Sequence, residues 1–220
     1  MSQPAEKDSP WLAWCFPLTA VLWLVLLAAV LGLPHLTGSP SLADDLTRNT
    51  VRLALLYYAA AVSLLICLPR GETPTISARA RLARWLWTLA WAAYVIHVGV
   101  AFHYVHHWSH AEAVQHTRDV SGFGEGIYFS HLFTVVWSAD VLSWWLWPAR
   151  HAARPAWVGR ALHGYMAFII FNATVVFETG WIRWAGVLLF ATLTSIWVFC
   201  RRRYRAGGTR GGDAPQTGPA

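Results

Sequence analysis

The chain has 220 residues, of which 56% are hydrophobic and only 13% are charged, about half the charged fraction of an average soluble domain. These values exclude a disordered chain, a coiled coil and an ordinary soluble enzyme, and three cysteines are too few for a disulfide scaffold. In a soluble protein, 17 Lys and Arg against 11 Asp and Glu would suggest nucleic acid. In so apolar a chain nucleic acid is not expected as a partner. The positions of the arginines instead indicate how the chain is oriented in a membrane.

A helix needs about 20 mostly apolar residues to cross a bilayer, and six stretches meet or approach this length. The predicted spans are residues 11–33, 51–68, 85–105, 127–147, 161–177 and 181–200. Because lipid cannot satisfy backbone polar groups, all six are expected to be helices. The predicted fold class is therefore all-α: a polytopic membrane protein with a single six-transmembrane-helix bundle. Polar tails at 1–10 and 201–220 are expected to be disordered.

Arginine is concentrated in alternate connections between the predicted spans. Residues 69–84 hold four arginines, residues 148–160 hold three and residues 201–210 hold five, whereas the intervening loops hold only Arg48 and Arg118, with Arg52 and Arg183 just inside neighbouring spans. The positive-inside rule then predicts that both termini are cytoplasmic. In a bacterial-type inner membrane, the histidine-rich stretch would lie on the outer, periplasmic side. The lipid bilayer is the expected partner, and other membrane subunits are a further candidate.

The same orientation places Cys15, Cys67 and Cys200 at cytoplasmic helix ends, away from the oxidising side where disulfides form. We therefore expect ordinary buried thiols. Most of the 15 tryptophans, Trp87 and Trp181 among them, fall near a predicted membrane border, which is typical of interfacial anchors.

Seven of the ten histidines lie within residues 97–131. If the third helix continues to about Val120, four of them fall within one arc of about 100°. Imidazoles spaced i, i+4 on one helix face can share a metal ion. The four candidate metal ligands are His103, His106, His107 and His110.

The string His103-Tyr-Val-His106-His107 is an HxxHH box. It resembles one of the histidine boxes of membrane-bound desaturases and hydroxylases, which implies a di-iron site. Those proteins use several boxes, normally on the cytoplasmic side, whereas this chain has no second box and its box is predicted to face outward. The resemblance therefore supports metal chemistry without assigning the family.

Four further polar residues converge on the outer third of the bilayer. At about 1.5 Å per residue, His97 lies about 12 Å and His131 about 6 Å below the outer ends of their spans. Glu178 ends the fifth span at the outer border, with Asn172 about 9 Å below it. Ionisable groups in a membrane usually face the bundle interior. His97 and His131 are candidate ligands of a b-type haem, and Glu178 is a candidate metal ligand.

Neutral imidazole suits iron, copper or zinc, and the lack of methionine near these histidines argues against a Cu(I) thioether site. Asp140 lies deeper, towards the inner side. It either pairs with Arg160 or His163 or is a step in a proton or ion path that includes Asn172.

Three functions stay open at this stage. The preferred one is a redox-related protein, such as a membrane oxidoreductase, that binds a transition metal or haem at the outer face. The second is a metal-ion or proton transporter with the histidines as vestibule and Asp140 as inner step. The third is a structural or assembly subunit of a larger membrane complex. The sequence identifies neither a substrate nor a catalytic residue.

Overall fold

The computed structural model describes residues 10–68 and 77–209, and every regular element in these ranges is helical. This confirms the all-α class. Residues 1–9, 69–76 and 210–220, which include Arg70, Arg210 and most of the predicted N-terminal tail, lie outside the described residues. The elements are α1 (Pro10–Leu36), α2 (Leu42–Cys67), α3 (Ala78–Tyr104), α4 (His110–Ser121), α5 (Gly126–Leu146), α6 (Pro148–Ala153), α7 (Ala156–Phe171), the π-helix η1 (Asn172–Val176) and α8 (Gly180–Thr209).

Four helices among the described residues are long and apolar enough to cross a membrane. They correspond to the first, second, third and sixth predicted spans: Trp14–Leu36, Leu42–Cys67, Ala78–Tyr104 and Gly180–Tyr204. Helices α5 and α7 do not meet the same combined requirement of length and apolar composition. Helix α5 carries His131 and Asp140 in its length, and α7 has only 16 residues before η1 begins.

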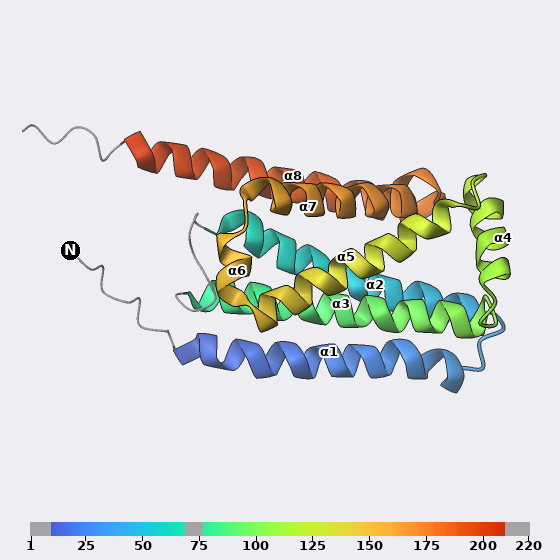
Figure 1. Ribbon diagram of the computed structural model, residues 1–220. Helices are drawn as coiled ribbons and strands as arrows, with labels where there is room; N and C mark the ends of the chain where they lie inside the picture. Colours follow the sequence, from blue (N-terminus) through green and yellow to red (C-terminus); the bar gives the residue numbers. More distant parts are fainter. Residues whose placement is uncertain (1–9, 69–76, 210–220) are drawn as a thin grey trace, which may run out of the picture.

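The long helices run roughly side by side, with α1 and α8 on opposite sides of the bundle (Figure 1). Helix α4 lies across one end of the bundle and α6 lies at the other. Helices α1 and α8 turn many large apolar side chains outward, such as Leu22 and Leu188, as expected for surfaces in lipid. The core lies between α2, α3, α5 and α7, around Tyr58, Trp87 and Trp137.

The third helix does not continue to Val120 as predicted but ends at Tyr104. The chain turns through His107 and Trp108, whose φ angles of 49° and 60° are unusual for residues with a side chain. The side chain of Ser109 then caps α4 by accepting from the backbone N–H of Glu112. This cap starts a new helix and interrupts the single histidine face that the sequence predicted.

Helix α8 passes very close to η1 at Gly186. A Cβ atom added there would lie 2.8 Å from Thr174 Oγ1 and 2.9 Å from the Thr174 carbonyl oxygen, so only glycine fits without displacement of η1. Phe171 and Phe190 pack edge to face at 5.3 Å beside this contact. Helix α8 therefore packs directly against the π-helix η1, an element that is frequent at functional sites.

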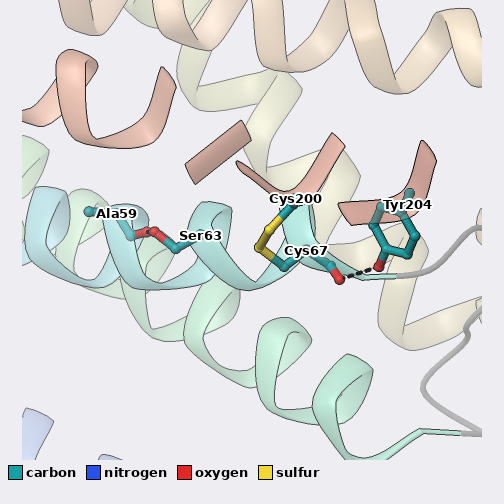
Figure 2. The surroundings of a disulfide bond; sticks show 5 residues. All are labelled: Ala59, Ser63, Cys67, Cys200 and Tyr204. Carbon is teal, nitrogen blue, oxygen red and sulfur yellow. Dashed lines mark hydrogen bonds between the residues drawn. A yellow bond between two sulfur atoms is a disulfide. The ribbon is translucent and has the colours of Figure 1, made fainter. Parts of the chain in front are cut away.

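The expectation of ordinary thiols is wrong for two of the three cysteines. Cys67 and Cys200 form a disulfide that joins the end of α2 to α8 (Figure 2). Their Cα atoms are 5.5 Å apart, and Tyr204 donates a hydrogen bond to the Cys67 carbonyl oxygen at 2.5 Å. The sequence could not show this pairing because it depends on α2 and α8 being neighbours. Helix α8 continues past the predicted span end at Cys200 to Thr209.

Candidate functional site

A cavity of about 240 Å³ lies in the half of the bundle nearer to α4. Its walls come from α2, α3, α5, α7 and η1, and they are mostly apolar. Both histidines proposed as a haem pair, His97 of α3 and His131 of α5, line this cavity, as does His106. Helices that are not consecutive in the chain therefore bring three of the predicted site residues to one cavity.

His97 is held in one orientation by its neighbours on α2. Its Nδ1 atom lies 3.0 Å from the Thr47 carbonyl oxygen and 3.4 Å from Thr50 Oγ1. A carbonyl oxygen can only accept, so the network assigns the proton of the neutral ring to Nδ1. Nε2 then carries the lone pair. Histidines that bind cofactors or metals are commonly fixed by such a bond from the other ring nitrogen.

Trp137 contributes a polar group that the protein leaves unsatisfied. Its side chain lines the cavity and is 2% exposed, and its Nε1–H has no hydrogen-bond partner among the described residues. A buried donor without a partner costs about 1–3 kcal/mol. Trp137 stacks on Tyr94 at 5.4 Å, and Tyr94 in turn lies 6.2 Å from the ring of His97. The cavity therefore has an aromatic wall that includes Trp137 and Tyr94, and Tyr94 lies beside the oriented imidazole of His97.

The four candidate metal ligands do not form one face. His106 is buried, its Nδ1 atom has no hydrogen-bond partner in the part of the chain that the structure describes, and its ring lies 5.3 Å from that of His116. His103 accepts from Trp108, His107 is exposed near Glu112, and His110 stacks on His131 at 5.4 Å. Within residues 10–68 and 77–209, no group of three His, Cys, Asp or Glu side chains could hold a metal ion. The break after Tyr104 is the physical reason, because it splits the predicted helix.

The other outer candidates are also apart from the cavity. Glu178 follows η1, and its carbonyl oxygen accepts from Arg183. Asn172 donates to the carbonyl oxygen of Phe168, one turn back in α7. Neither residue lines the cavity that holds His97 and His131. The predicted convergence at one depth therefore brings together the two histidines but not the carboxylate and the amide.

His106 is expected to make the α3–α4 junction sensitive to acid. Burial, then repulsion from His116, lowers the pKa of its imidazole below the ordinary 6.5, while Glu112 opposes the shift. The folded protein therefore takes up fewer protons here than the unfolded chain. Stability at this junction is present above about pH 6.5 and declines as the pH falls through that value towards the lowered pKa. After correction for the intrinsic pH dependence of amide exchange, the protection of backbone amides in residues 105–121 should be a few-fold lower at about pH 5.5 than at about pH 7.5.

Two variants check this assignment. His106→Asn should remove most of the pH dependence of amide protection at the junction, and His116→Ala should raise the pKa of His106 as measured by NMR. An exchange rate in residues 105–121 that responds to acid equally in the parent and in His106→Asn would contradict it.

A second polar cluster lies at the opposite end of the bundle, around Asp140. The carboxylate is 4% exposed and forms an ion pair with Arg154. Trp87 Nε1 donates to its Oδ2 at 2.9 Å, and His151 Nε2 lies 3.3 Å from Oδ1. The predicted partners, Arg160 and His163, are therefore replaced by residues of α6 and the residue that follows it. With three donors around it, this carboxylate has the environment of a structural ion pair.

His163 lies beside this cluster without joining it. Its Nδ1 is buried and unpartnered among the described residues, and its ring meets Trp87 edge to face at 5.3 Å. It lines a cavity of about 230 Å³ together with Asp140, His151 and Arg154. Trp87 is 0% exposed, so its assignment as an interfacial anchor is wrong. It instead packs on Trp137 at 5.2 Å and connects the two ends of the core.

Several of these residues were missed for identifiable reasons. The signal for the break after Tyr104 is the pair Ser109 and Glu112, a capping-box spacing that precedes a helix. Trp137 looked like any apolar residue of a span, because only the fold shows which indole lacks an acceptor. Arg154 and His151 follow the predicted end of the fourth span. They reach Asp140 only because α6 turns back towards α5.

The fold and its cavities define a helical, apolar protein with an interior aromatic site, and comparison with known proteins adds nothing to that description. No protein-family model, no curated protein and no solved structure matches this chain.

Proposed function

We propose that this chain is a multi-pass membrane protein that binds a redox-active cofactor in the cavity between α2, α3, α5 and α7. In this proposal α5 and α7–η1 complete six spans, both termini are cytoplasmic, and the cavity lies in the outer half of an inner-type membrane. The arginine distribution supports this orientation. The protein acts as a membrane oxidoreductase or as the subunit that passes electrons to one.

The observation that carries the proposal is the joint placement of His97, His131 and the aromatic ring of Trp137 on one cavity. A mostly apolar pocket with a few convergent polar groups is the usual form of a cofactor site. His97 lies seven residues before the end of α3, about 10 Å along the helix axis. A site at that depth favours a cofactor that dissolves in lipid.

The outer histidines of the HxxHH box fit a bound iron, copper or zinc less well. Their side chains are divided between the end of α3, the turn and α4, as described above. A b-type haem between His97 and His131 is a more specific form of the proposal. The outward apolar faces of α1 and α8 leave room for lipid or for neighbouring subunits.

The test is cofactor analysis of the full-length protein purified in mild detergent from its native membrane. An optical spectrum reports haem, metal quantification reports iron, copper and zinc, and solvent extraction reports organic cofactors. We expect a cofactor at close to one per chain. The content should fall about tenfold or more in His97→Ala and in His131→Ala.

His35→Ala is the matched control, because His35 is an exposed histidine outside the cavity. Its cofactor content should equal that of the parent protein. A well-folded preparation that lacks any cofactor, or equal content in all three variants, would refute the proposed function.

A further inference from the structure

We propose that Arg201, Arg202 and Arg203 of α8, here called the arginine turn, form a binding surface for the head groups of anionic phospholipids. Their guanidinium groups contact the lipid phosphates where α8 leaves the membrane. The inference concerns a partner of the protein and does not depend on the cofactor proposed above.

The first step is the direction in which this part of α8 is held. Cys200 forms the disulfide with Cys67, and Tyr204, one turn later, donates to the Cys67 carbonyl oxygen (Figure 2). One face of α8 is therefore turned towards the end of α2. At about 100° per residue, Arg202 lies on the opposite face, and the other two arginines of the turn lie on either side of it. The two links to Cys67 thus present the arginine turn outward.

The second step is the charge of this surface. All three arginine side chains are exposed, and none of them forms an ion pair within residues 10–68 and 77–209. Helix α8 contains no Asp or Glu, and the acidic residues of α2 lie in its first turn, at the other end of that helix. Three cations on one turn therefore lack a nearby counter-charge, and guanidinium groups match phosphate oxygens in geometry and charge.

The third step is the depth of the arginine turn in the membrane. Residues Gly180–Tyr204 are long and apolar enough to cross a bilayer, and no charged residue lies between Arg183 and Arg201. The side chains of Trp197 and Tyr204 are exposed beside the arginines, and the guanidinium carbon of Arg201 lies 5.0 Å from the centre of the Trp197 ring. Exposed Trp and Tyr are typical of the membrane border, so the adjacent guanidinium groups lie at the level of the lipid head groups.

The experiment measures lipid binding to the purified full-length protein in mild detergent by native mass spectrometry. Dioleoyl phosphatidylglycerol is the anionic probe, and dioleoyl phosphatidylcholine, which has no net charge, is the reference. We expect the anionic lipid to bind at least about tenfold more tightly. The double variant Arg202→Gln with Arg203→Gln should weaken its binding by about fivefold for each arginine and leave the reference lipid unaffected.

Arg48→Gln with Arg52→Gln is the matched control, because both arginines are exposed and the variant loses the same net charge. Both lie more than about 20 Å from Cys67 along α2, well beyond the Debye length of about 10 Å at 0.1 M salt. Affinity for the anionic lipid should change by less than about twofold. Melting temperatures and size-exclusion profiles without added lipid establish that each variant is folded.

Three results would overturn the inference. Equal affinity for the two lipids would show that the surface does not select anionic head groups. An equal loss in Arg150→Gln with Arg160→Gln, two exposed arginines of α6 and α7, would assign binding to the basic end as a whole rather than to α8. Tighter binding of an acidic peptide such as hexaglutamate would assign the surface to a protein partner.

Discussion

Replacement of Asp140 by alanine is expected to destabilise the folded protein by about 3–5 kcal/mol, because one partner of a buried ion pair is removed while the other remains. The substitution leaves the Arg154 guanidinium without its anion and the Trp87 indole without its acceptor. Asp140→Asn should cost less, since an amide oxygen can still accept from Trp87. Denaturant titration in mixed micelles, followed by circular dichroism, measures the difference.

The control for this prediction is Asp119→Ala. Asp119 is an exposed carboxylate on α4 that accepts from Gln115, so its loss should change stability by less than about 0.5 kcal/mol. A double variant, Asp140→Leu with Arg154→Met, should recover much of the lost stability by removing both charges. Equal stability of Asp140→Ala and the parent would show that the cluster is not a structural ion pair.

Loss of the disulfide is the second change with a large expected effect. Cys67 and Cys200 are 133 residues apart in the sequence. A cross-link over so long a loop stabilises a protein by about 2–5 kcal/mol, chiefly by restricting the unfolded chain. Cys67→Ser, or treatment of the parent with a reductant, should therefore lower the melting temperature to a similar extent. Reductant should have no further effect on Cys67→Ser.

Cys15→Ser is the control for this prediction, because Cys15 lies outside the disulfide. Its melting temperature should match that of the parent and should still fall on reduction. Thiol labelling before and after cell lysis adds a test of orientation. In a Cys15→Ser background, after the Cys67–Cys200 disulfide has been reduced with a membrane-permeant reductant, labelling in intact cells should reach Cys67 and Cys200 only with a membrane-permeant thiol reagent, because the arginine-rich end that holds them is expected to be cytoplasmic.

Sequence patterns predicted the features that depend on local composition. Long apolar runs predicted helices because the bilayer sets a minimum length and demands internal hydrogen bonding, and four of these helices have the composition of spans. Helical rise alone placed His97 and His131 at comparable depths, and the structure puts both on one cavity. Asp140 was predicted either to pair with Arg160 or His163 or to be a step in an ion path; it is buried and paired, but its partner is Arg154.

The features that depend on helix packing could not be predicted in the same way. The disulfide requires α2 and α8 to be adjacent, and the partners of Asp140 depend on the direction in which α6 turns. The histidine face failed for a local reason. A cap of about 1 kcal/mol at Ser109, together with the left-handed turn at His107 and Trp108, outweighed the helical preference of the residues beyond it.

The contacts of helix α8 with the bundle include two of different kinds: a covalent bond at Cys200 and a close backbone contact at Gly186. Fourteen residues separate them, about 21 Å along the helix axis. The Gly186 contact is with Thr174, a residue that also lines the cavity. Reduction of the disulfide would therefore remove the covalent link of α8 to α2 and leave the contact between α8 and the cavity wall in place.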